Sequence, residues 1–185
     1  MPSVEPLVKA YTDFVALPWQ TNLAPAQRIW MVVYPPREER RVRVRLQEFE
    51  IATLQAGHTW SVVDLTDEFA SWLSGHDYRD VYFASPELLD ASALEEFGDH
   101  LYARVTSALT DEHVDQGSVV ALVGVGSLFS FYRVSRLLER VAPSIRGRLL
   151  VLFPGDRDGS NYRMLEAQDG WNYLATPIAP TEDMA

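Results

Sequence analysis

The sequence contains no cysteine and only one lysine, Lys9, among its 185 residues. Without thiols the chain can form neither disulfides nor cysteine-ligated zinc or iron–sulfur sites, and it has no thiol nucleophile. No signal peptide is expected, because Glu5, Lys9 and Asp13 interrupt any apolar stretch near the N-terminus. A chain of this kind suits a reducing compartment, so we expect a cytoplasmic protein.

Positive charge and long apolar runs are also scarce. The chain has 26 acidic and 16 basic residues and a formal net charge of −10, which repels phosphate backbones. Its longest apolar run, residues 119–125, is far shorter than the roughly 20 residues that a membrane-spanning helix needs. We therefore expect neither membrane insertion nor direct, sequence-specific nucleic-acid binding.

Apolar and aromatic residues are plentiful, at 47% and 11% of the chain. This composition supports a real hydrophobic core and argues against intrinsic disorder. The Gly- and Asp-rich stretch 154–159 is too short to separate two domains. The sequence therefore predicts a single domain over residues 1–180, followed by a frayed tail at 181–185.

Helical and strand-like patterns alternate along the chain. Helices are expected where apolar residues recur every three or four positions, and strands where short runs are β-branched and apolar. The helices fall at residues 4–14, 38–56, 69–73, 94–108 and 128–141, and the strands at 29–34, 60–64, 119–125 and 149–153. This alternation predicts a three-layer α/β domain with an open, mostly parallel sheet, Rossmann-like or flavodoxin-like. Residues 75–90 give no clear pattern, and strand order stays open.

Capping residues mark several of the expected helix ends. Gly57 stands where a left-handed C-cap would end the second helix, and Thr66 is a candidate N-cap for the third. Ser92 and Glu95 form a capping-box pattern before the fourth helix. Ser127 is expected to cap the fifth helix, directly after the third strand.

The C-terminal segment contains a hairpin signal. Asp169 and Gly170 lie between two short apolar runs, residues 162–165 and 171–174. Residues 162–167 could equally form a short helix. The fold class therefore includes a C-terminal hairpin with that alternative open.

The turn at residues 124–127 is the strongest candidate for nucleotide binding, because a glycine-rich turn after a buried strand can bind phosphate. It lacks the third glycine of a dinucleotide fingerprint and the Gly-Lys-Ser/Thr ending of a P-loop. Acidic and polar residues expected at the same edge of the sheet could form a magnesium site: Asp64, Asp67, Ser127, Asp156 and Asp158. Turn formation and capping explain these residues more simply. We therefore expect no metal, no cofactor and no catalytic activity, with a nucleotide- or Mg-binding regulatory domain as the alternative.

A basic cluster precedes and enters the second helix. It consists of Arg37, Arg40, Arg41, Arg43 and Arg45, and it could meet phosphate or an acidic partner. Ordinary ion pairing along the helix is favoured, with Glu39 pairing to Arg43 and Arg45 to Glu48.

The preferred partner-binding element is the C-terminal hairpin together with one upstream tryptophan. Interface hot spots are enriched in tryptophan, tyrosine and arginine. The expected partner-binding residues are Trp19, Tyr162, Arg163, Asp169, Trp171, Asn172 and Tyr173. Packing of Trp171 and Tyr173 onto the sheet is an equally weighted alternative.

Short motifs along nearly the whole chain match those of a known family. The most similar are the C-terminal runs, residues 161–163, 169–175 and 177–178. Further matches are residues 17–20, 22–23, 39–41, 48–50, 56–58, 64–66, 121–125, 145–150 and 153–155, together with Trp30 and Tyr34. Together these motifs resemble the BrxB family of bacteriophage exclusion (BREX) systems. The chain departs from the family at residues 156–159 and in its short end after Pro180.

The resemblance implies a component of an antiviral, phage-resistance complex that also contains an alkaline-phosphatase-like protein (PglZ), a large ATPase (BrxC) and an adenine DNA methyltransferase (PglX). It implies a non-catalytic adaptor or scaffold that supports host DNA methylation and phage exclusion through protein–protein interaction. PglZ is the first expected partner and BrxC the second. No catalytic residues are implied.

Overall fold

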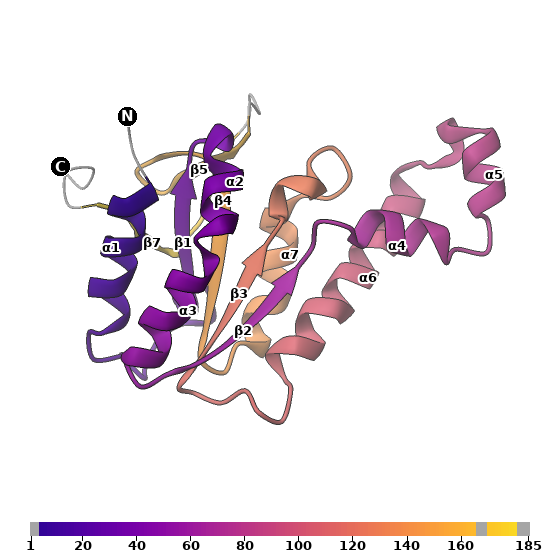
Figure 1. Ribbon diagram of the computed structural model, residues 1–185. Helices are drawn as coiled ribbons and strands as arrows, with labels where there is room; N and C mark the ends of the chain where they lie inside the picture. The colour runs from indigo at the N-terminus through magenta and orange to yellow at the C-terminus, as the bar shows by residue number, and fades with distance from the viewer. Residues whose placement is uncertain (1–3, 166–169, 181–185) are drawn as a thin grey trace.

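The computed structural model describes residues 4–165 and 170–180 of the chain. A mostly parallel sheet lies at its centre, with helices on both faces (Figure 1). The strands are β1 (Ile29–Tyr34), β2 (Thr59–Asp64), β3 (Ser118–Val123), β4 (Arg148–Asp158), β5 (Asn161–Met164), β6 (Trp171–Asn172) and β7 (Thr176–Ile178). The α/β fold class predicted from the alternating pattern is confirmed. The predicted frayed tail at 181–185 lies outside the described residues.

The strand order is β2-β3-β4-β1-β7, and every neighbouring pair along it is parallel. The central strands β3 and β4 are buried on both faces, which explains why residues 119–123 and 149–153 read as unbroken apolar runs. The edge strand β2 is more exposed and alternates weakly. Burial on both faces thus sets the composition of each strand.

Two apolar clusters cover the two faces of the sheet. The helices are α1 (Val4–Val15), α2 (Glu39–Val44), α3 (Leu46–Gln55), α4 (Glu68–Ser74), α5 (Arg79–Ala84), α6 (Ala91–Leu109) and α7 (Val134–Val141). One cluster joins α1, α2 and α3 to the sheet, and the other joins α6 and α7 to the opposite face. From β1 the chain passes over β4 and β3 to the edge strand β2, and it then returns through β3 to β4. Because all these crossovers have the same hand, the helices of the outward step and those of the return steps lie on opposite faces of the sheet.

Several local predictions are confirmed. The first helix ends before Pro18, and the first strand spans Ile29–Tyr34 as expected. Gly57 has a φ of +86°, the left-handed conformation predicted for the C-cap. The helix expected at 38–56 is present but divides at Arg45, whose φ of −98° and ψ of 8° leave the helical region.

Three expected helix caps are wrong, although the helices predicted at 69–73 and 94–108 are present. The helix expected after residue 127 begins only at Val134, because Ser130 is left-handed (φ 69°) and Arg133 is extended, so helical hydrogen bonding cannot propagate through the loop. Ser127 instead lies in the short 3₁₀ helix Val125–Leu128. Asp90, and not Ser92, caps α6, because its carboxylate accepts the amide N–H groups of the first turn.

Thr66 is also not an N-cap. Its hydroxyl donates to Asp64, and α4 begins at Glu68 after Asp67. The start of α4 is therefore not capped by the residue that the sequence favours.

The predicted C-terminal hairpin is confirmed, and residues 162–164, where a short helix was the alternative, belong to strand β5. β5 pairs antiparallel with β6, with Tyr162 opposite Trp171. The fourth strand is longer than expected, because β4 runs on to Asp158 and pairs antiparallel with β5. Glycine at position 155 permits this close pairing, since a Cβ there would lie 2.0 Å from the carbonyl oxygen of Arg163.

Residues 75–90, which gave no clear pattern, belong to a projecting arm. We define the arm as residues 68–90, which comprise α4, α5 and the 3₁₀ helix Pro86–Leu88. Figure 1 shows it extending away from the sheet beyond β2, alongside the start of α6. Within the described ranges, no helix has the length and apolar character needed to cross a membrane.

Candidate functional site

The carboxyl ends of β1 and β2 are joined by a polar network around Arg43. Arg43 donates to Glu39 (2.7 Å) from Nε and to Asp64 (3.1 Å) from Nη1. It also donates to the Thr66 hydroxyl, which in turn donates to Asp64. Tyr34, the last residue of β1, donates its hydroxyl to Glu39. The predicted Glu39–Arg43 pair is therefore confirmed, as is Arg45–Glu48 at 2.6 Å.

Two pKa shifts follow from this network. Burial raises the pKa of Tyr34, and its hydrogen bond to Glu39 raises that pKa further. Partial burial works to raise the pKa of Asp64, but hydrogen bonds from Thr66 and Arg43 outweigh it and hold the pKa below its ordinary value. Asp64 is thus an ionised acceptor whose two oxygens are already engaged.

The turn at residues 124–127 packs against this network through Gly124. Gly124 has a φ of +75°, and a Cβ there would lie 2.6 Å from the Thr66 hydroxyl and 2.7 Å from Asp64 Oδ1. The amide of Ser127 donates to the Gly124 carbonyl, and that of Phe129 to the Gly126 carbonyl. Glycine is therefore explained by close packing and a left-handed turn, and these amides are used within the chain.

The five residues considered for magnesium are not gathered around one point. Asp64 is bound by Thr66 and Arg43, whereas Asp156 and Asp158 belong to the β4–β5 ladder. In the part of the chain that the structure describes, no group of three or more histidine, aspartate or glutamate side chains is placed to hold a metal ion. The described geometry gives the nucleotide or magnesium alternative no support.

The residues predicted to bind partners divide into buried and accessible ones. Tyr162 and Tyr173 are 1% and 7% exposed and belong to the core. Burial raises the pKa of Tyr173 to about 12, and the charge of Glu139 adds to this. Arg163 is exposed, and Trp171 is partly buried. Asp169 and the side chain of Asn172 lie outside the described residues.

Trp171 lies at the wall of a groove beside the hairpin. Its ring centroid is 5.3 Å from that of Phe153 and 5.9 Å from that of Tyr162. The groove has a volume of about 550 Å³, and its walls include Phe129, Tyr132 and Met164. The sequence could not distinguish packing from binding for Trp171. In the structure Trp171 packs on Phe153 and Tyr162 and also lines the groove.

Trp19 lies near the amino ends of β1, β4 and β7, whereas the hairpin follows the carboxyl half of β4. Its ring stacks on His58 with a centroid separation of 3.6 Å and meets Trp30 edge-on at 5.2 Å. Its indole N–H donates to the carbonyl of Val15. The structure therefore does not bring Trp19 together with the other predicted site residues.

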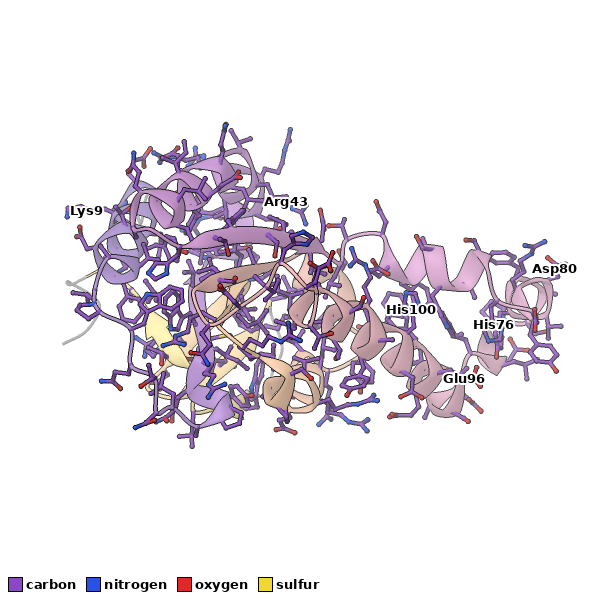
Figure 2. The ribbon with its side chains drawn as sticks, turned by 90° about the horizontal axis from the view of Figure 1, so that it is seen from below. Lys9, Arg43, His76, Asp80, Glu96 and His100 are labelled. Carbon is purple, nitrogen blue, oxygen red and sulfur yellow. The ribbon has the colours of Figure 1, made fainter. Side chains whose placement is uncertain are left out.

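The arm exposes a set of large apolar side chains. Its base is anchored, since Phe69 stacks on Phe131 at 3.9 Å and meets Phe97 of α6 at 5.2 Å. Beyond His76 the exposed residues are Tyr78 (63%), Val81 (46%), Phe83 (63%) and Leu88 (51%). Figure 2 shows His76, Asp80 and Glu96 at this end of the molecule, far from Lys9 and Arg43. Exposed apolar clusters of this kind mark interaction sites.

Sequence reasoning missed the arm because residues 75–90 have neither helical nor strand periodicity. The available signal was composition, since Tyr78, Val81, Tyr82 and Phe83 fall within six positions that lack a core-facing pattern. A segment rich in large apolar residues but without such periodicity is poorly suited to packing on its own domain.

One comparison with known proteins gives a match. The family model described as BREX protein BrxB matches residues 83–178, just over half of the chain. No curated protein and no solved structure matches the chain. The matched residues run from α5 to β7 and include the hairpin, whereas the resemblance noted over residues 17–66 lies outside them.

Proposed function

Because this chain belongs to the BrxB family and is a component of a BREX phage-defence system, we propose that it is a non-catalytic adaptor that binds larger BREX proteins. PglZ is the first proposed partner and BrxC the second. The adaptor supports host DNA methylation and phage exclusion by holding these components together. One observation carries this proposal: the arm projects from the domain and exposes Tyr78, Val81, Phe83 and Leu88.

The exposed apolar residues of the arm make it a suitable docking element. Large aromatic side chains contribute most of the binding free energy in protein interfaces when a partner buries them. The base of the arm is fixed by aromatic packing on α6, and His76 contacts Glu96 at 3.2 Å. A partner therefore meets an element that is already ordered, which lowers the entropic cost of binding.

Charge around the arm indicates the chemistry of the partner surface. Exposed carboxylates flank the apolar residues: Asp77, Asp80, Glu87 and Asp90. Arg79 is the single basic residue in this stretch, and it lies 3.6 Å from Asp80. The matching partner surface is an apolar groove with an arginine- or lysine-rich rim.

Co-purification of the complex tests this proposal. The tagged chain is co-expressed with PglZ and BrxC from its own operon, captured by affinity and analysed by size exclusion. We expect wild type to co-elute with at least one of them and Phe83→Ala to weaken that association at least about tenfold, as loss of a hot spot does. Raising the salt concentration should weaken it further, because the rim contacts are electrostatic.

Leu54→Ala is the matched control. Leu54 is also an exposed helical residue, at 53%, but it lies on α3 and away from the arm. The control variant should co-elute like wild type. Elution of the wild-type chain alone at every salt concentration would overturn the adaptor proposal, and equal co-elution of Phe83→Ala would overturn the role of the arm.

The hairpin groove is a second proposed partner surface. Arg163 is exposed on β5, and Trp171 borders the groove with Phe129. Arginine and tryptophan are among the residue types that dominate interfaces. Tyr162 and Tyr173 contribute by holding the hairpin in place, because both are buried.

A further inference from the structure

A second, smaller cavity lies at the amino ends of β1, β4 and β7. Its volume is about 290 Å³. Its walls are mainly apolar and include Phe14, Leu23 and Trp30, and the segment with Leu17 and Trp19 closes one side. Its one charged wall residue is Arg148, the first residue of β4.

Arg148 is 5% exposed, yet no described carboxylate neutralises it. Its Nη1 donates to the Gly147 carbonyl (2.9 Å) and its Nη2 to the Gln20 carbonyl (2.7 Å). Its Nε is buried without a hydrogen-bond partner among the described residues. The guanidinium carbon lies 4.8 Å from the ring centroid of Trp19 and 5.6 Å from that of Trp30.

This arrangement is unusual because an isolated buried charge is costly. A buried arginine is normally paired with a carboxylate, and a guanidinium has five N–H donors to satisfy. Burial lowers the pKa of Arg148, and the nearby positive charge of Arg28 lowers it further. Arg28 itself donates to the Ile145 carbonyl and forms no ion pair with a described carboxylate. Arg28 and Arg148 therefore place two positive charges close together near the amino ends of the strands, although the chain as a whole is strongly acidic.

We propose that this cavity is a docking site for a carboxylate carried by an apolar segment of a partner protein. The guanidinium of Arg148 binds the carboxylate, while Trp19, Trp30 and Leu23 surround the adjoining apolar group. Charge complementarity selects this occupant, since an anion supplies the counter-charge that the described residues lack. The site is separate from the arm, so its test does not depend on the role proposed for the arm.

A purely structural role for Arg148 makes a different prediction. In that case the two carbonyl hydrogen bonds hold the segment around Gln20 against the sheet, and the cavity has no preference for anions. The comparison of an acid with its uncharged amide separates the two roles, because fold stabilisation alone gives no such preference.

The probe is 4-phenylbutyrate, and 4-phenylbutanamide is its uncharged counterpart. Binding to the full chain is followed by the indole N–H signal of Trp19 in a ¹H–¹⁵N spectrum, assigned with Trp19→Phe. We expect saturable shifts with a dissociation constant on the order of 1 mM for the acid, which is reasonable for a ligand of this size. Binding of the amide should be at least about tenfold weaker, because the charge-assisted hydrogen bonds are lost.

Two variants and one control complete the test. Arg148→Met should weaken binding of the acid at least about tenfold, and Leu23→Trp should block it by filling the cavity while leaving Arg148 in place. Arg146→Met is the matched control, since Arg146 also donates to two carbonyls, those of Asp111 and Val114, but lies outside the cavity. It should bind like wild type.

The proposal is overturned if acid and amide bind wild type equally, or if neither shifts the Trp19 signal at about 20 mM, well above the expected dissociation constant. The proposal is also overturned if the folded Leu23→Trp variant binds 4-phenylbutyrate as well as wild type does. If Arg148→Met fails to fold, the acid–amide comparison in wild type and the Leu23→Trp variant decide the result.

Discussion

At the scale of single residues, Asp64 connects three elements at the carboxyl edge of the sheet. It ends β2, accepts from Arg43 of α2, and packs against Gly124 after β3. Each of its oxygens accepts a hydrogen bond from Arg43 or Thr66. Its carboxylate therefore stabilises the fold by linking β2 to α2 and to the start of the following loop.

The lowered pKa of Asp64 predicts that its contribution to the stability of the fold depends on pH. Its pKa in the folded chain lies below the ordinary value, so its contribution is fully present above the unfolded-state pKa of about 3.9 and is lost as the pH falls through the folded value. Asp64→Asn should therefore have a lower free energy of unfolding than wild type near neutral pH. The difference should shrink below about pH 4, as measured by urea denaturation across this range.

Asp67→Asn is the control for this measurement. Asp67 is an exposed aspartate close in sequence, and its side chain does not cap α4. The stability difference between this variant and wild type should be small at every pH. A pH-independent effect of Asp64→Asn would contradict the role given to its charge.

At the scale of elements, aromatic packing adds to strand pairing in holding the hairpin β5–β6. Phe153 of β4 meets Tyr162 at 6.1 Å and Trp171 at 5.3 Å. A two-stranded hairpin alone is marginally stable in water, so these contacts hold it to the sheet. The loop after β3 forms the other wall of the groove that the hairpin borders.

Trp171→Ala should destabilise the chain by about 2 kcal/mol, less than a fully buried tryptophan would lose, because Trp171 is only partly buried. Thermal or urea denaturation measures this loss. The expected loss comes from the packing of Trp171 on Phe153 and is separate from any loss of partner binding.

Leu174→Ala is the matched control, because Leu174 is 74% exposed in the same segment. Its stability should equal that of wild type within about 0.5 kcal/mol. An unchanged free energy of unfolding for Trp171→Ala, combined with lost partner binding, would assign Trp171 to the interface alone.

At the scale of the whole molecule, the two apolar clusters share the same sheet, and the arm extends from it (Figure 1). We propose that residues 1–180 form one domain, since β3 and β4 contribute side chains to both clusters. Neither layer of helices can lose its contacts without exposing the central strands. Unfolding of one layer should therefore accompany unfolding of the other.

The thermal unfolding of the full chain should accordingly be a single transition, and Mg-ATP should not raise its midpoint. The amide of Ser127 donates within the turn, and both oxygens of Asp64 accept hydrogen bonds, so we expect neither nucleotide nor metal to bind there. Calorimetry with and without about 5 mM Mg-ATP makes the measurement, because a ligand that binds the folded state must raise the midpoint. Sodium chloride at matched ionic strength controls for charge screening of this acidic chain. A ligand-specific rise would favour the nucleotide-binding alternative.

The sequence by itself determined the fold class, the first helix, the strand Ile29–Tyr34, the left-handed Gly57 and the existence of the hairpin. These features depend on local backbone preference and on the period of apolar residues, and both can be read from one amino-acid sequence. It also indicated the ion pairs of Arg43 and Arg45 with glutamates four and three positions away, because spacing alone places them together.

Only the tertiary structure decided the strand order, the burial of Tyr162 and Tyr173, and the exposure of the arm. It also determined that Arg148 contacts the carbonyl of Gln20, a residue 128 positions away in the chain. Such features depend on which distant segments meet across the sheet, and local patterns carry no information on that pairing. The same tyrosine can be an anchor or a core residue, and the difference lies in what packs against it.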